Sequence, residues 1–266
     1  MKRLFVITLM GLLFLGVFSA PAVARGFHRG DIVKVMTRNQ YLGANLDPVI
    51  LAESLDEFFA EATDALNTIA ANNFPLRARR FATEVALTKP DLIGLQEVFN
   101  FELNDGNPRP PFVNHLTETL DALAAKGQSY VVAATVKNLD ITIPFPFDVD
   151  GDGFEDIVSV VDRDVILARE GVAFIPLDGD YMTGGLCGFL IREHPLLGSI
   201  DLQSTPSEDG CNYTIVAKVD DEDLPPITIE RGFVGVDATV RGKTYRFVNT
   251  SSRGCGSLHY PAPAGV

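Results

Sequence analysis

The sequence PDLIGLQEV occupies residues 90–98 and contains a short, nearly continuous apolar run from Leu92 to Leu95. A run of this length, bounded by proline and polar residues, predicts a strand that is buried on both faces. Glu97 follows the run almost directly, so its carboxylate is expected where a core strand ends. The chain is therefore expected to contain a sheet that is covered on both sides.

Upstream, the residues DIVKVMTRN (31–39) are rich in strand-forming side chains and end in polar ones. This pattern predicts a strand that brings Asn39 to its C-terminal edge. Between the two strands, apolar residues recur at helical spacing over residues 46–72. Pro75 restarts a helix, and Pro90 ends it.

Downstream, the pattern changes from alternating strands and helices to strands alone. A helix is predicted over residues 112–125 and a strand over residues 130–136. Further β-rich segments, separated by glycine, proline and acidic turns, occupy residues 163–169, 211–219, 227–240 and 244–249. The mixture predicts an α+β sandwich with helices over the outer sheet faces.

The first 24 residues have the pattern of an export signal. Lys2 and Arg3 precede an apolar stretch over residues 4–20, and Ala22-Val23-Ala24 forms a cleavage site. We expect a secreted or periplasmic protein with no stable membrane span after cleavage; the alternative is an uncleaved anchor. The rest of the 266 residues is long enough for one domain with a substantial core.

The charge of the chain limits its partners. The formal net charge is −13, and removal of the signal makes it more negative. Such a protein repels polyanions at long range, so binding of long nucleic acids is disfavoured, whereas divalent cations and small phosphoesters remain compatible. Local basic residues are expected on a solvated helix face, namely Arg77, Arg79 and Arg80.

The cysteines indicate a disulfide. Export permits one, and a bond between Cys187 and Cys211 would close a loop of moderate length. Cys255 is then left over, which is unusual in an exported protein.

Asn39 and Glu97 are the strongest candidates for a functional site. Each is an oxygen-bearing side chain placed where a predicted strand ends, so the two can meet at a common rim. An amide oxygen and a carboxylate are suitable partial ligands for Mg²⁺, which prefers oxygen and keeps several waters. The alternative is that Asn39 caps a turn and Glu97 pairs with an arginine.

These segments resemble the endonuclease/exonuclease/phosphatase superfamily, whose fold is deoxyribonuclease-I-like. MTRNQYLG (36–43) and PDLIGLQEV (90–98) are similar to its first two motifs. RDVILAR (163–169) and RFVNT (246–250) extend the similarity in order, so the domain would span residues 25–250.

The resemblance implies a four-layer α/β sandwich and metal-assisted hydrolysis of phosphodiester or phosphomonoester bonds. Asn39 and Glu97 would be catalytic residues and ligands of Mg²⁺, or of Mn²⁺ in its place. Arg163 would have a structural role or lie at the rim of the substrate site. The expected substrate is a small phosphoester or a phospholipid headgroup.

The sequence departs from the family after Thr250. The family continues with a catalytic histidine and with later Asp–Asn and Asp–His motifs, whereas here Ser251 follows and those motifs are missing. We therefore expect a C-terminally truncated family domain with a divergent tail over residues 251–266. A frameshift near Thr250 would explain the tail and Cys255, and natural truncation is the alternative; the coding DNA distinguishes them. None of the histidines matches a family position: His28, His115, His194 and His259.

A second candidate site lies in the acidic sequence DVDGDGFED (148–156). Its aspartates match the beginning of an EF-hand-like Ca²⁺ loop, with Gly153 at the sharp turn and Ser159 where the bidentate glutamate should stand. We expect weak structural Ca²⁺ binding rather than a plain acidic turn. The ligands would be Asp148, Asp150, Asp152 and Asp156.

Two functions follow from this sequence. The first is an exported Mg²⁺-dependent phosphoesterase, impaired by truncation. The second is a catalytically dead remnant or a Ca²⁺-binding exported domain. The missing histidine and Asp–His motifs favour the second for activity, because each supplies acid–base or charge stabilisation in the family's reaction.

Overall fold

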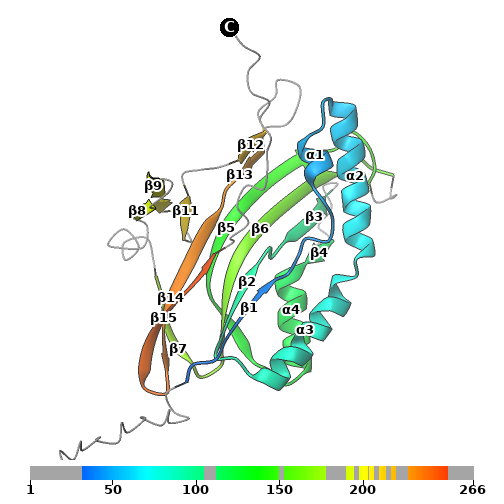
Figure 1. Ribbon diagram of the computed structural model, residues 1–266. Coiled ribbons are helices and arrows are strands. Elements are labelled where there is room, and N and C mark those ends of the chain that lie inside the picture. The colour runs from blue at the N-terminus through cyan, green and yellow to red at the C-terminus, as the bar shows by residue number, and fades with distance from the viewer. Residues whose placement is uncertain are drawn as a thin grey trace, which may run out of the picture. The chain divides into compact units, whose positions relative to one another are not determined.

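The computed structural model describes residues 32–104, 112–149, 153–177, 190–194, 198–202, 204–206, 210–213, 217–219 and 227–250. The expected signal peptide and the tail after Thr250 lie outside these residues. In the part described, two sheets face each other and helices cover the outer side of the first (Figure 1). The predicted mixed α+β class is therefore confirmed. None of the described helices is long and apolar enough to cross a membrane.

Among the described residues, six strands form the first sheet. They are β1 (Val35–Asn39), β2 (Leu92–Gln96), β3 (Asn100–Asn104), β4 (Val113–Asn114), β5 (Tyr130–Pro144) and β6 (Ile157–Arg169). β6 pairs with β5 along one side and with β2 and β3 along the other. β1 pairs in parallel with β2, and all five residues of β2 are buried, as predicted for a strand covered on both faces.

The helices follow the apolar periodicity of the sequence and cover one face of this sheet. They are α1 (Asp47–Ile50), α2 (Leu55–Ala71), α3 (Phe74–Thr88) and α4 (His115–Ala125). Val85 of α3 and Leu123 of α4 are fully buried in one cluster with Ile93 and Leu95 of β2. Burial of each such side chain contributes roughly 1.5–3 kcal/mol to stability. These helices therefore fix the position of the strand that ends beside Glu97.

Helical spacing over residues 46–72 predicted a helix there, but the structure contains two, α1 and α2. The helices are separated by residues 51–54, and Ser54 caps α2 by accepting a hydrogen bond from the Glu57 backbone N–H. Pro75 lies in the first turn of α3, where its missing N–H costs nothing. The helix ends directly before Pro90, as the sequence predicted. Lys89, which ends it, has a left-handed conformation.

A second sheet faces the first and has β14 near its centre. Its described strands are β7 (Ala173–Pro176), β10 (Ser204–Pro206), β11 (Cys211–Tyr213), β14 (Gly232–Val240) and β15 (Lys243–Thr250). β14 pairs with β15 on one side and with β7 and β11 on the other. Two further pairs form separate two-stranded sheets: β8 (Leu190–His194) with β9 (Gly198–Leu202), and β12 (Ala217–Val219) with β13 (Ile227–Ile229).

The facing surfaces of the two sheets form an apolar layer. Val234 and Val236 of β14 lie in one cluster with Val136 of β5 and Ile166 of β6. No described helix covers the outer face of the second sheet (Figure 1). The expected helical cover is thus present on the first sheet within the described residues.

Candidate functional site

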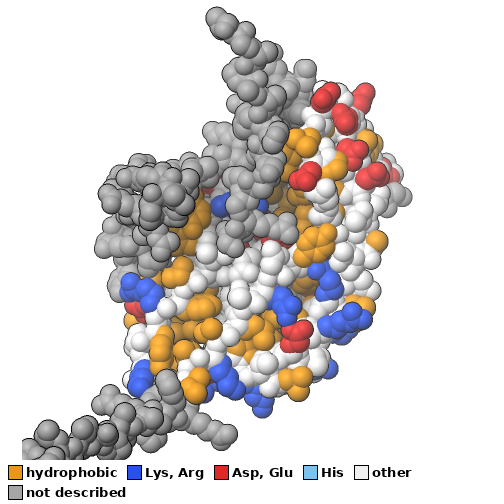
Figure 2. Space-filling model, viewed as in Figure 1, with side chains coloured by type: hydrophobic (Ala, Val, Ile, Leu, Met, Phe, Trp, Pro, Cys, Tyr) orange, Lys and Arg blue, Asp and Glu red, His pale blue; other side chains and the backbone are white. Residues whose placement is uncertain are grey.

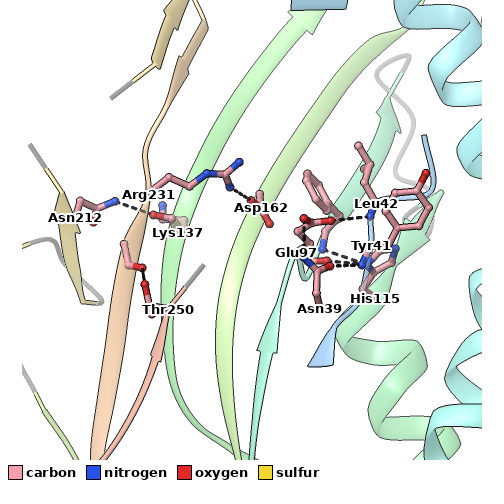
Figure 3. A network of polar contacts seen from close by, with 12 residues as sticks. Asn39, Tyr41, Leu42, Glu97, His115, Lys137, Asp162, Asn212, Arg231 and Thr250 are labelled. Carbon is pink, nitrogen blue, oxygen red and sulfur yellow. Dashed lines mark hydrogen bonds and ion pairs between the residues drawn. The ribbon is translucent and has the colours of Figure 1, made fainter. Parts of the chain in front are cut away.

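Asn39 and Glu97 meet at one edge of the first sheet. β1 and β2 are parallel neighbours, so their carboxyl ends lie together, with Asn39 opposite Gln96 in the register. The Asn39 Nδ2 donates a hydrogen bond to Glu97 Oε1 at 2.7 Å (Figure 3). The strand endings that the sequence indicated therefore bring both predicted ligands into contact.

The backbone around Asn39 and Glu97 has unusual conformations. Glu97 and Tyr41 have φ of +55° and +56°, a left-handed conformation that costs on the order of 1–3 kcal/mol outside glycine. In return, the Tyr41 N–H donates to Asn39 Oδ1 at 2.7 Å and the Leu42 N–H donates to Glu97 Oε2 at 3.2 Å. The loop after β1 thus holds the Asn39 amide and the Glu97 carboxylate in place. Glu97 is 7% exposed.

His115 supports Glu97 from the helix side. Its Nδ1 lies 3.1 Å from the Glu97 carbonyl oxygen, and its ring stacks on Phe74 with centroids 3.7 Å apart. The pKa of His115 is lowered to about 4, chiefly by burial and also by the nearby charge of Arg77, against the opposing effect of the hydrogen bond to the Glu97 carbonyl. The imidazole is therefore neutral at pH 7. The sequence did not predict the contact between His115 and Glu97, because the spacing of residues along the chain does not indicate that α4 begins beside Glu97.

The expectation that Arg77, Arg79 and Arg80 form a solvated face is wrong for Arg77. Arg79 and Arg80 are exposed as predicted, but the Arg77 guanidinium donates to the Gln40 carbonyl at 2.6 Å and to the Tyr41 carbonyl at 3.0 Å. It also lies 4.9 Å from the centroid of the ring that stacks on His115. Arg77 therefore holds the loop after β1 against α3.

Two aspartates are buried on β6, and one of them, Asp162, interacts electrostatically with Glu97. Asp162 and Asp164 share the face of β6 that turns Ile166 toward the second sheet, because strand side chains alternate. Asp162 Oδ2 lies 3.3 Å from the Arg231 guanidinium, and Asp162 lies between Arg231 and Glu97 in Figure 3. The pKa of Asp162 is raised to about 7, chiefly by burial and also by the charges of Asp164 and Glu97, against the opposing effect of Arg231.

The sequence contains a signal for these two aspartates. Acidic residues at positions 162 and 164 alternate directly before the apolar run of residues 165–168, which predicts that they share a buried face. Arg163, expected to have a structural role or to lie at the substrate rim, lies on the opposite face of β6 and is half-buried. Its carbonyl accepts a hydrogen bond from the Val98 N–H at 2.9 Å.

Asn249 joins the second sheet to the strands of the site. Its Nδ2 donates to the Leu95 carbonyl at 2.8 Å and to the Val165 carbonyl at 3.1 Å, and its Oδ1 accepts from the Gln96 amide. Gly94 leaves room for this, because a Cβ there would lie 2.6 Å from Asn249 Oδ1. The VNT segment thus contacts the PDLIGLQEV segment across the two sheets.

The acidic loop after β5 is described in part. Asp148 Oδ2 accepts from the Gly153 N–H at 2.6 Å, and Asp156 Oδ2 accepts from the Val149 N–H at 2.7 Å. Gly153 has φ of +98°, as the sharp turn requires. The other predicted Ca²⁺ ligands, Asp150 and Asp152, lie outside the described residues, so Ca²⁺ binding stays a prediction.

Cys211 is fully buried and disulfide-bonded. Its predicted partner, Cys187, lies outside the described residues, as does Cys255.

Asn39 and Glu97 offer hard oxygen donors of the type that Mg²⁺ prefers. Each oxygen has more than one lone pair, so the hydrogen bonds described above do not use up its capacity. No three or more His, Cys, Asp or Glu side chains in the described ranges form a group suited to a metal. In this structure the Asn39 amide N–H faces Glu97, and the Asn39 Oδ1 accepts from the Tyr41 N–H, as in the turn cap given as the alternative. A metal held by both residues would require the Asn39 amide to turn its oxygen toward Glu97.

No protein-family model matches the chain, and no match was found among curated proteins or solved structures.

Proposed function

We propose that this chain is an exported phosphoesterase-type domain of the endonuclease/exonuclease/phosphatase superfamily that uses Mg²⁺ or Mn²⁺. The observation that carries the proposal is the contact between Asn39 and Glu97, 2.7 Å apart at the ends of adjacent parallel strands. Both residues lie in the segments that resemble the family's first two motifs. The finer fold, a four-layer sandwich of the deoxyribonuclease-I-like type, belongs to the same proposal and is supported by the two facing sheets.

Each residue of the site has a distinct part in this proposal. Asn39 and Glu97 would hold the ion, which when bound polarises phosphoryl oxygens and stabilises the leaving oxyanion. His115 and the Leu42 N–H position Glu97. The substrate would be a small phosphoester or a phospholipid headgroup, because the net charge of −13 disfavours long nucleic acids.

Hydrolysis of bis(p-nitrophenyl) phosphate tests the activity. If the domain is active, its turnover requires Mg²⁺ and falls by more than about 100-fold in Glu97→Ala, since even outer-shell changes at metal sites cost 10–100-fold. Glu170→Ala, which removes an exposed carboxylate, is the matched control and keeps full activity. Turnover that survives Glu97→Ala would rule out this site.

The sequence VNTS (248–251) favours a second function, a catalytically dead remnant, because Ser251 stands where the family has its histidine. Metal binding separates the two. In both cases Mg²⁺ should raise the melting temperature of the wild type but not of Glu97→Ala, because an ion that binds only the folded state stabilises it. Stabilisation without turnover identifies a remnant that keeps the metal site, and a melting temperature that is insensitive to Mg²⁺ contradicts the phosphoesterase proposal.

A further inference from the structure

A cleft of about 210 Å³ lies between the end of β1 and α3. Its lining includes Arg38, Gln40, Phe74, Arg77, Arg80 and Thr119. Figure 2 shows basic side chains gathered around an acidic one over α3, whereas acidic side chains gather over the end of the molecule that carries α1 and the start of α2. The volume is several times the roughly 30 Å³ that one water molecule takes in the liquid.

The cleft carries an excess of positive charge. Three arginines and one carboxylate, Glu84, line it, in a chain whose net charge is −13. Arg38 forms an ion pair with Glu84 at the rim. Arg77 gives its hydrogen bonds to carbonyl oxygens, which leave its charge unneutralised, and its Nε is buried without a hydrogen-bond partner among the described residues. Arg80 is exposed and has no ion pair with any residue that the structure describes.

The walls of the cleft are partly apolar. Phe74, Ala78 and Phe81 line it, and low-dielectric walls focus the field of the arginines on an anion. At the inner end, the Gln40 amide and the Thr119 hydroxyl are hydrogen-bonded to each other at 3.0 Å and are both buried. Guanidinium groups match the geometry of phosphate oxygens, with which they form paired hydrogen bonds.

We propose that this cleft binds a phosphate group without a metal ion, as a site separate from Glu97 but next to Asn39. The phosphate group belongs to a small soluble phosphate compound or to a lipid headgroup, which present the same oxygens to the arginines. Asn39 lines both the cleft and the proposed metal site, so phosphate binding is measured without Mg²⁺ to separate it from the proposed hydrolysis.

Calorimetric titration of the full chain with inorganic phosphate, in EDTA, tests the proposal. We expect saturable binding that Arg80→Gln weakens by about tenfold, since one hydrogen bond to a charged group is worth about 1.5–3 kcal/mol. Arg79→Gln removes the same charge from a neighbouring exposed position outside the cleft and should leave binding unchanged. Glu84→Gln should tighten binding several-fold, because it removes the negative charge at the rim.

Equal weakening by Arg79→Gln and Arg80→Gln, or no saturable binding, would overturn the proposal, since either shows that only general electrostatics act. Glu97→Gln keeps an acceptor for the Asn39 amide but removes the charge, so it should keep phosphate binding while abolishing the proposed hydrolysis. The two proposals can therefore fail separately. Sedimentation with phosphatidylcholine vesicles, with and without phosphatidic acid, identifies the source of the phosphate. Binding that requires phosphatidic acid and Arg80 indicates a lipid headgroup, and binding of phosphate alone indicates a soluble compound.

Discussion

Gly94 and Asn249 show how a single residue type is required where two sheets meet. The Asn249 side chain is held by hydrogen bonds to the Leu95 and Val165 carbonyls and to Gln96, so it cannot easily move away from a new methyl group. A Cβ at position 94 would lie 2.6 Å from Asn249 Oδ1 and 3.0 Å from its Cγ. The close approach excludes any larger side chain at Gly94 unless Asn249 shifts.

We therefore expect Gly94→Ala to lower the free energy of unfolding by about 1–3 kcal/mol, the usual cost of overpacking. Urea denaturation of Gly94→Ala, Asn249→Ala and the double variant measures the coupling. If the clash causes the loss, the double variant loses less than the sum of the two single variants. Additive losses would mean that Gly94 matters for another reason.

His115 should make the protein sensitive to acid. Its pKa is about 4 in the folded protein and 6.5 ordinarily, so between these values the unfolded chain binds more protons and stability falls as the pH falls. The difference corresponds to about 3 kcal/mol, present above pH 6.5 and lost on the way to pH 4. His115→Phe keeps a ring against Phe74 without the titration. The stability advantage of the wild type over this variant should shrink by that amount in urea titrations from pH 7 to pH 4.

Asp162 acts in the opposite direction in the same window. Its pKa is about 7 when folded and 3.8 ordinarily, so the folded protein holds the extra proton and stability falls as the pH rises from about 4 to about 7. Asp162→Asn should therefore gain stability relative to the wild type as the pH rises. Parallel profiles for the wild type and both variants would contradict these assignments.

At this scale, the sequence predicted residues that follow from where strands end, such as Asn39 and Glu97. It did not predict His115, Asp162 or the role of Arg77. Their surroundings depend on which helix lies beside which strand, and residue spacing does not carry that information.

At the scale of elements, Ser54 separates two helices that apolar spacing does not distinguish. Residues 46–72 keep the helical period, but the Ser54 side chain accepts the Glu57 N–H at 3.2 Å, so a new helix begins at Leu55. The serine is the sequence signal for this break, since a serine before an apolar period is typical of a helix start.

Ser54→Ala should lower the free energy of unfolding by about 1 kcal/mol, because it leaves an N–H of the first turn without its acceptor. Chemical denaturation followed by circular dichroism measures this loss. Asn67→Ala, on the exposed face of α2, is the control and should be neutral or slightly stabilising. A Ser54→Ala variant as stable as the wild type would show that packing alone sets the start of α2.

β5 and β6 extend well beyond the strands predicted at 130–136 and 163–169. β5 contains irregularities between Val132 and Ala134 and between Lys137 and Leu139. Each extra residue in β5 interrupts its alternation of apolar and polar positions, which explains why periodicity alone ends β5 too early.

At the scale of the whole molecule, the α+β class and the buried central strand followed from the sequence, but the contact between the sheets did not. The face that β14 turns toward β6 is apolar, as in any sandwich, and such a pattern does not specify which sheet it meets. The contacts of Asn249 form only when the two sheets pack against each other.

The contacts of Asn249 also predict the order in which the two sheets form during folding. Asn249 bonds to carbonyls 154 and 84 residues earlier in the chain, whereas β1 to β6 and their helices end by Arg169. Contacts between residues so distant in sequence require large loops to close, so we expect the first sheet to form in the transition state and the Asn249 contacts after it. Asn249→Ala should then speed unfolding in stopped-flow experiments and leave the refolding rate nearly unchanged. Slower refolding with an unchanged unfolding rate would place this side chain in the folding nucleus.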